Sequence, residues 1–351
     1  EREMSPARAA QGWERPDLGR ADLSLVADSR GVAGLVAQAP AGSIHLCQGI
    51  RGNGLVGLAQ KQLARRGLRQ WVVMETVNDQ GIGGWLKRLE YRRLFWVWRA
   101  HLDGVLAIGH ATPRWARARG VPANKVYPFA YFLGDDLPVE PVAVGKGHRF
   151  RVLFVGQLIE RKRLELLVRS VARLSDTAVE LTVVGSGPEE ARLRRLAERL
   201  LGERLEWVGR LPRKEVPSVM AGADCLVLPS RYDGWGAVVA EALMVGTPVV
   251  CSDRCGAAGA VRASGMGGVF PSGDGEALTS LLRGVLEAGP ATPAQRRVLA
   301  AWARCLGAPE GARYLAGVLR HAAGQAQRPA PPWTADAPTS VNPQAQEAVA
   351  R

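Results

Sequence analysis

The sequence predicts an α/β protein with two Rossmann-like, doubly wound lobes that face each other across a cleft. Short apolar runs alternate with helical runs along most of the chain, which favours parallel sheets covered on both faces. A segment rich in Gly, Pro and Asp, residues 134–148, divides this alternation into two series. The 351 residues are enough for two separate cores, and a cleft between two lobes is a common place for a ligand.

The first series predicts strands at 23–27, 44–48, 71–75, 105–109 and 125–129. Helical spacing with basic last turns connects them, as in 57–66 and 113–119. The polar stretch before residue 20 holds no strand followed by a Gly-rich turn, which usually opens such a domain. We therefore expect the first lobe, residues 1–145, to lack its first strand.

The second lobe is predicted at 146–290. Its strands are expected at 151–155, 180–184, 205–208, 225–228 and 248–251, and its helices at 164–173, 189–201, 214–221 and 237–245. Helices at 291–323 are expected to pack back toward the first lobe, anchored by Trp302 and Tyr314. The Pro-, Ala- and Gln-rich tail, 324–351, is predicted to be disordered.

The composition limits the partners and the compartment. A net charge of +13 is compatible with acidic partners, but forty Arg against six Lys in an Ala- and Gly-rich chain also fits coding bias, so we predict no nucleic-acid partner. Five cysteines, three of them in apolar strand-like runs, do not form a disulfide framework. The sequence shows no signal peptide and no run of about 18 apolar residues. A cytoplasmic protein is predicted.

The most informative motif is the segment 229–250, PSRYDGWGAVVAEALMVGTPVV. A buried strand ends in a turn with Gly234 and Gly236, and a helix begins near Ala237. Exposed amides at such a helix start can cradle a phosphate, and the glycines allow close approach of a ligand. Asp233 and Glu241 supply carboxylates that accept hydrogen bonds from hydroxyl groups.

This segment resembles the E-x7-E signature of the family 4 retaining glycosyltransferases (glycosyl transferases group 1, GT-B fold), with Asp233 in place of the first Glu. The resemblance implies that Asp233 contacts a donor sugar and Glu241 a nucleotide ribose. Three further segments resemble the family in the same order: 154–163 (FVGQLIERKR), 183–188 (VVGSGP) and 208–212 (VGRLP). Lys162 matches the Lys that binds the diphosphate in this family. Gln157 stands where the family usually has an Arg, and Arg161 or Arg163 could supply the missing positive charge.

The resemblance implies an enzyme that moves a hexose-like sugar from a nucleoside-diphosphate-sugar donor to a glycan or lipid-linked acceptor, with retention of configuration. The catalytic residues are then Lys162, Asp233 and Glu241. The donor-binding residues are Gly156, Gln157, Arg161, Lys162, Gly185, Ser186, Gly187, Gly209, Leu211, Asp233, Gly234, Trp235, Gly236, Ala237 and Glu241.

Two other classes of function stay open. One is a non-catalytic or truncated sugar-nucleotide binder, and the other is a nucleotide-sugar epimerase, which needs acid–base groups that the five His residues do not supply. We expect no cofactor besides the nucleotide sugar as substrate. We also expect no metal, because Lys162 and the helix start can stabilise the charge of a leaving diphosphate.

The first lobe offers two candidate surfaces. Glu75, at the end of a predicted strand, is an acceptor-side candidate. The segment 84–101 places Arg88, Arg92 and Arg99 on one helical stripe beside Trp85 and Trp96. This pattern suits peripheral contact with an anionic membrane, at the inner face, but also an ordinary lobe helix whose Trp residues are core.

Overall fold

The computed structural model describes residues 19–334, except 52–53, 80, 82, 135–148 and 175–178. The chain forms two compact units, Glu1–Pro128 and Phe129–Arg351. Their border lies earlier than the predicted border at 145/146. Phe129 stacks on Tyr314 with ring centroids 6.1 Å apart, and Leu133 forms a bridge with Gly307, so this stretch packs with the C-terminal helices of unit 2.

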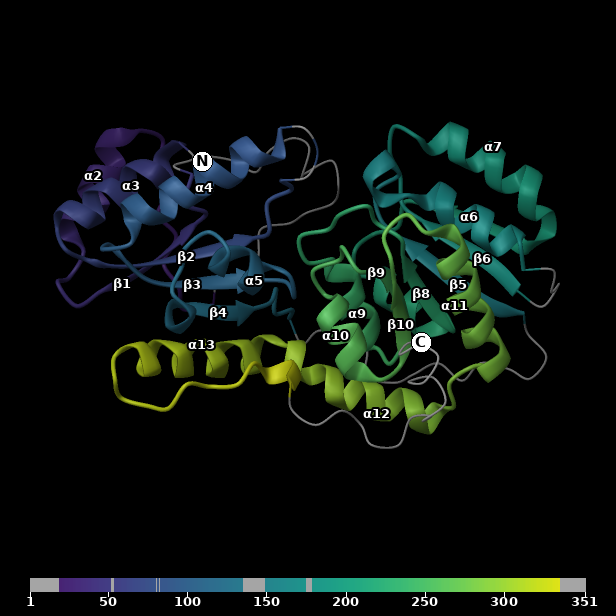
Figure 1. Ribbon diagram of the computed structural model, residues 1–351. Helices are drawn as coiled ribbons and strands as arrows, with labels where there is room; N and C mark the ends of the chain where they lie inside the picture. Colours follow the sequence, from purple (N-terminus) through teal and green to yellow (C-terminus); the bar gives the residue numbers. More distant parts are fainter. Residues whose placement is uncertain are drawn as a thin grey trace. The chain divides into compact units, whose positions relative to one another are not determined.

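Unit 1 holds a sheet of four strands among its described residues, in the order β1-β2-β3-β4 (Figure 1). The strands are β1 (Ile44–Gln48), β2 (Arg69–Glu75), β3 (Leu102–Ile108) and β4 (Val126–Phe129). The helices are α2 (Ser29–Gln38), α3 (Gly54–Arg65), α4 (Gly84–Trp98) and α5 (Thr112–Arg117). β1, β2 and β3 pair in parallel, as predicted. The predicted strand at 23–27 is wrong, since Leu23 and Leu25 are exposed and the segment pairs with no strand of the described chain.

Unit 2 holds a sheet in the order β10-β9-β8-β5-β6-β7, and its strand pairs are parallel. The strands are β5 (Phe150–Val155), β6 (Val179–Val184), β7 (Leu205–Gly209), β8 (Cys225–Leu228), β9 (Val249–Ser252) and β10 (Gly267–Phe270). The five predicted strands of this lobe are confirmed within two residues; β10 was not predicted. The order reverses between β5 and β8, and in doubly wound sheets ligands bind at the carboxyl ends of the strands at such a switch point.

Helices cover both faces of this sheet (Figure 1). Apolar residues of α6 (Leu164–Ala172), α7 (Glu190–Leu201) and α11 (Gly275–Ala288) form a core with one face. The other helices are α8 (Val216–Gly222), α9 (Ala237–Met244), α10 (Ala258–Ser264), α12 (Pro293–Ala303) and α13 (Ala308–Ala322). None of the helices in the described ranges is long and apolar enough to cross a bilayer.

The C-terminal segment is more ordered than the sequence predicts. Residues 325–334 are described, and Trp333 lies in a short 3-10 helix, Pro332–Thr334. Its ring is 6.2 Å from Trp235, 6.2 Å from Phe132 and 6.3 Å from Tyr314. The prediction of a disordered tail from 324 is therefore wrong as far as 334, because an aromatic cluster holds Trp333; residues 335–351 lie outside the described part. The predicted packing of 291–323 toward the first lobe stays a prediction.

Candidate active site

The predicted donor residues follow the carboxyl ends of β5, β6, β7 and β8 or lie on α9. Gly156, Gln157, Arg161 and Lys162 follow β5; Gly185, Ser186 and Gly187 follow β6; Gly209 and Leu211 end or follow β7; Asp233, Gly234, Trp235 and Gly236 follow β8; Ala237 and Glu241 lie on α9. Because the strands are parallel, the structure brings these segments to one edge of the unit 2 sheet. This edge includes the switch point between β5 and β8.

Glycines let the loops after β5 and β6 approach each other closely. A Cβ on Gly185, whose φ is +143°, would lie 1.9 Å from the carbonyl oxygen of Gly156. A Cβ on Gly187 would lie 2.5 Å from the carbonyl oxygen of Leu158, whose amide donates to the Ser186 carbonyl at 2.9 Å. The glycine pattern in 183–188 therefore has a packing cause beside any contact with a ligand.

Lys162 and Asp233 form the central contact of the site. The Lys162 Nζ lies 2.5 Å from Asp233 Oδ2, and the two side chains are only 12% and 13% exposed. Ser230 Oγ donates to the same oxygen at 3.3 Å. Arg161 Nη1 is 3.7 Å from it and donates to the Tyr232 carbonyl at 2.7 Å. A half-buried carboxylate is thus surrounded by two cations and a hydroxyl.

The turn that carries Asp233 is fixed through its main chain. The Asp233 amide donates to the Arg254 carbonyl at 3.0 Å, and the Gly256 amide donates to the Asp233 carbonyl at 2.9 Å. Gly236, the residue before α9, has a φ of +85°, and a Cβ there would lie 2.7 Å from Cys255 Sγ. The turn therefore ends in a conformation that favours glycine, and the first amides of α9 are left without acceptors inside the helix.

Glu241 lies one turn into α9 and is largely enclosed. Burial raises the pKa of its carboxyl group, while the positive charge of Arg213 acts in the opposite direction. Arg213 follows the segment 208–212, so Glu241 and the end of β7 belong to one electrostatic environment. Sequence reasoning missed Arg213 and Ser230, although Ser230 lies inside the motif 229–250 and Arg213 directly follows the segment 208–212.

Trp235 places its side chain in the interior of unit 2, and its donor-binding role stays a prediction. Its indole is buried, its Nε1 has no hydrogen-bond partner, and its ring faces Trp333. The main chain of Trp235 belongs to the turn, where its carbonyl accepts from the Ala257 amide at 2.8 Å and from Cys255 Sγ at 3.1 Å. The side chain thus anchors the turn from within unit 2.

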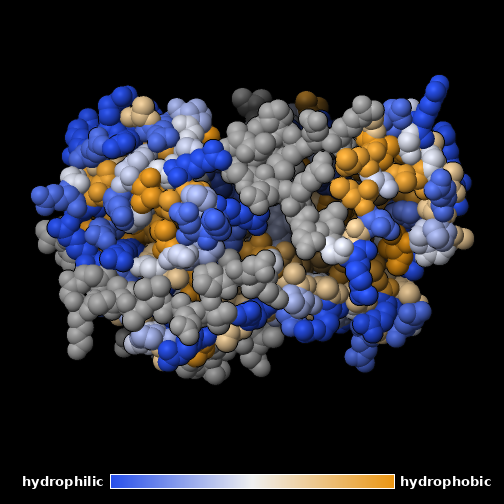
Figure 2. Space-filling view, turned by 180° about the vertical axis from the view of Figure 1, so that it is seen from behind, coloured by the Kyte–Doolittle hydropathy of each residue, from blue (hydrophilic) through white to orange (hydrophobic). Residues whose placement is uncertain are grey.

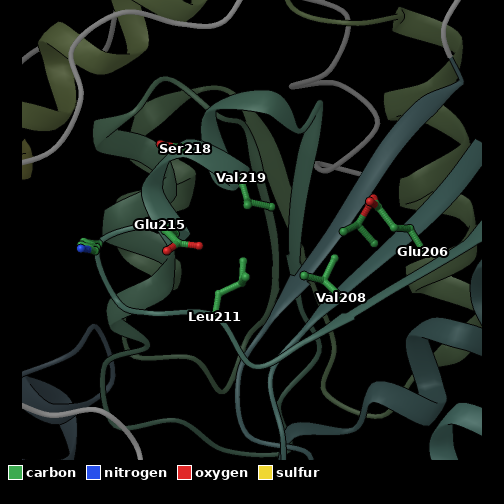
Figure 3. Close-up of a pocket in the computed structure, with 8 residues that line it drawn as sticks. Glu206, Val208, Leu211, Glu215, Ser218 and Val219 are labelled. Atoms are coloured by element: carbon green, nitrogen blue, oxygen red, sulfur yellow. The ribbon is translucent and has the colours of Figure 1, made fainter.

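A cavity of about 560 Å³ lies between α8 and the strands β6 and β7 (Figure 3). Leu211, Val219 and the carboxylate of Glu215 point toward its space, and Glu206 accepts a hydrogen bond from the Thr182 hydroxyl at 2.9 Å. Leu211 is its one lining residue among the predicted donor residues. We therefore place the chemistry at the Lys162–Asp233 contact, where the charges meet, rather than in this cavity.

The remaining candidates lie elsewhere. Glu75 ends β2 in unit 1 and is half-buried, and its acceptor-side role stays a prediction. Within the described ranges, no group of three His, Cys, Asp or Glu side chains could hold a metal ion. All five cysteines are free thiols, and Cys251 and Cys255 are buried.

The part of the chain that carries these candidate site residues is similar to a known protein family. Residues 141–300 match the family model described as "Glycosyl transferases group 1". This segment, somewhat less than half of the chain, is thus similar to a group 1 glycosyltransferase domain. It contains the contact between Lys162 and Asp233, the turn at Gly236 and Glu241.

Two proteins similar to part of this chain are named as sugar transferases. The chain is 38% identical over 99 residues to a 2-deoxystreptamine glucosyltransferase of Streptomyces kanamyceticus, covering 27% of this chain and 26% of the relative. It is 33% identical over 154 residues to a GDP-mannose-dependent alpha-(1-6)-phosphatidylinositol monomannoside mannosyltransferase of Mycolicibacterium smegmatis, covering 40% of each. The matches thus span well under two thirds of either relative.

Solved structures extend the similarity beyond this segment. Anabaena Alr3699/HepE in complex with UDP superimposes with a TM-score of 0.66 at 19% identity, covering 83% of this chain and 82% of that one. At this identity the likeness shows the fold. The fold is GT-B, with two Rossmann-like units built on parallel sheets, and the predicted fold class is confirmed. The arrangement of the two lobes across a cleft stays a prediction.

Proposed function

We propose that the protein is a metal-independent, nucleotide-sugar-dependent glycosyltransferase that transfers a hexose from a nucleoside diphosphate to a glycan or lipid-linked acceptor. The observation that carries the proposal is the Lys162–Asp233 contact at the switch point of a domain similar to group 1 glycosyltransferases. The contact unites a cation for a leaving diphosphate with a carboxylate for sugar hydroxyls. It forms from residues 71 positions apart in the sequence.

The transfer step breaks the bond between the sugar C1 and the diphosphate oxygen, which keeps the electron pair. A bond forms between C1 and the acceptor oxygen, whose proton passes to the departing diphosphate, and the configuration at C1 is retained in this proposal. Negative charge develops on the diphosphate, so fixed positive groups lower the barrier. Lys162, Arg161 and the first amides of α9 are the groups that supply this potential, and for this reason we expect no requirement for a divalent cation.

Glu241 is assigned to the donor nucleoside. Its carboxylate can accept hydrogen bonds from ribose hydroxyls while Arg213 favours the ionised form. Asp233 is assigned to the donor sugar. Its Oδ2 already contacts Lys162, so the same carboxylate can orient the Lys162 ammonium and accept a hydrogen bond from a sugar hydroxyl through its second oxygen.

The relatives support a hexosyl donor without fixing the base. One is named a glucosyltransferase, another depends on GDP-mannose, and the HepE structure holds UDP. Glu75 remains our candidate on the acceptor side. A cytoplasmic site of action with peripheral membrane contact is likewise part of the proposal, and it accords with a lipid-linked acceptor.

The test combines binding with turnover. The purified protein is mixed with UDP- and GDP-hexoses and the corresponding diphosphates, without added metal, and thermal shift, sugar transfer and donor hydrolysis are followed. We expect stabilisation and slow donor hydrolysis by the wild-type protein, and loss of turnover in Lys162→Ala and Glu241→Ala. Lys61→Ala and Glu287→Gln change exposed residues outside the site and should behave like the wild type. Stabilisation without turnover would show a binder, and isomerised donors would show an epimerase.

A further inference from the structure

Helix α4 of unit 1 presents apolar side chains on two sides. Tyr91 and Phe95 are buried, and their rings lie 5.1 and 6.3 Å from the ring of Trp115. A second set faces solvent: Trp85, Leu89 and Trp96 are 54%, 53% and 65% exposed. At about 100° per residue these three lie within roughly 40° of arc, so they form one stripe along the helix. An ordinary lobe helix with core Trp residues is therefore the wrong description for Trp85 and Trp96.

The stripe is bordered by positive charge. Arg88, Arg92 and Arg99 are exposed and lie on one flank of it, and the Arg99 guanidinium carbon is 4.5 Å from the Trp96 ring centroid. Glu90 is the sole acidic residue of α4, and Arg51, between β1 and α3, binds it at 2.9 Å. The exposed side of α4 thus combines an apolar stripe with a row of guanidinium groups that no acid of the helix neutralises.

Figure 2, seen from behind, shows apolar side chains exposed on several parts of the surface. The stripe on α4 is defined by the exposed fractions of Trp85, Leu89 and Trp96. Clustered apolar side chains of this size usually mark an interaction site. The charge pattern selects the kind of partner. A second copy of α4 would bring two arginine rows together and be repelled, whereas an anionic surface attracts the row while its apolar layer accepts the stripe.

We propose that α4 docks on anionic lipid bilayers, with Trp85, Leu89 and Trp96 entering the headgroup region and Arg88, Arg92 and Arg99 contacting lipid phosphates. Tryptophan suits this depth because its ring is apolar and its N–H is polar. Arginine side chains reach phosphate from a helix that lies flat on the surface. The inference deepens the proposed function, since it places the enzyme where a lipid-linked acceptor lies, yet vesicle binding is measured without any donor.

The test is co-sedimentation of the full chain with phosphatidylcholine vesicles, with and without about one third phosphatidylglycerol, at two salt concentrations. We expect binding to the anionic vesicles alone, weakened by salt. Trp85→Ser with Trp96→Ser should lower the partition coefficient at least about tenfold. Replacing Arg88, Arg92 and Arg99 with Gln should lower it about fivefold for each charge. Leu35→Ser, at an exposed site on α2, is the matched control and should bind normally.

Four outcomes would overturn the proposal. They are equal binding to both kinds of vesicle, unchanged binding of the double Trp variant, self-association in the ultracentrifuge that the Trp changes abolish, and tight binding of an oligonucleotide in place of vesicles. Thermal unfolding of each variant shows that it is folded, as expected for changes at exposed positions. Glu241→Ala should bind vesicles like the wild type, so a wrong donor-site assignment and a wrong docking surface give different results.

Discussion

The contact between Lys162 and Asp233 yields the sharpest prediction. Replacing Lys162 with Met keeps the length of the side chain and removes its charge. Asp233, 13% exposed, then keeps only Ser230 at 3.3 Å and the more exposed Arg161 at 3.7 Å. Breaking a fully buried ion pair costs about 3–5 kcal/mol, and an exposed pair is worth about 0–1 kcal/mol. Because both side chains retain some exposure and Arg161 can move closer, we expect about 1–3 kcal/mol of lost stability.

The effect on catalysis should be larger and independent of stability. Loss of one preorganised group that stabilises developing charge typically costs about 2.7–4 kcal/mol of barrier, or about 10²–10³ in kcat. Asp233→Asn and the double variant that combines it with Lys162→Met complete a double-mutant cycle. The double variant leaves no unpaired charge, so it should recover much of the stability that Lys162→Met loses while staying inactive.

Urea unfolding and donor hydrolysis measure the two effects separately. A coupling energy near zero in the double-mutant cycle would mean that the ion pair contributes nothing to stability. Turnover within a factor of about three of the wild type in Lys162→Met would refute the role of Lys162 as the cation for the leaving diphosphate.

Three further predictions concern the turn and its surroundings. Burial raises the pKa of Glu241 above its ordinary 4.5, so the free energy of unfolding falls as the pH rises past that value and the buried carboxyl group ionises. Glu241→Gln removes this cost. The variant should therefore unfold at a higher urea concentration than the wild type at pH 7, and at the same urea concentration as the wild type at pH 4. An equal difference at both pH values would contradict this. Gly236→Ala should lower the free energy of unfolding by more than about 2 kcal/mol, because φ is +85° and the added Cβ would lie 2.7 Å from Cys255 Sγ. Gly265→Ala, at φ +65° and ψ 6° with no atom within 4 Å of the added Cβ, should cost only about 1–2 kcal/mol in the same urea assay. Trp333→Ala removes three ring contacts worth about 0.5–1.5 kcal/mol each, so the melting temperature should fall. A melting temperature within about 1 °C of the wild type would show that these contacts do not stabilise the segment 325–334.

Local pattern was sufficient for most of the unit 2 sheet. A parallel strand buried on both faces is a short, mostly apolar run. β8 (CLVL) is wholly apolar, β5 (FRVLFV) contains one charged residue, and β6 (VELTVV) is apolar except for Glu180 and Thr182. β10 was missed because it begins with Gly267 and Gly268, which have little strand propensity. A Cβ on Gly267 would lie 1.9 Å from the Val249 carbonyl oxygen, so this strand depends on its neighbour rather than on its own residues. At 23–27 a mostly apolar run was predicted to be a strand but pairs with no strand of the described chain, because apolar residues alone do not make a strand.

The sequence by itself determined the fold class, the two α/β series and the segments that carry the candidate site, because each is written in short-range periodicity, glycine placement and motif order. Only the tertiary structure decided that Lys162 meets Asp233, that Arg213 acts on Glu241 and that Trp85 and Trp96 face solvent. These facts depend on which strands are neighbours and which helix face meets the core. Residues 71 positions apart come together through strand order, which no local pattern encodes.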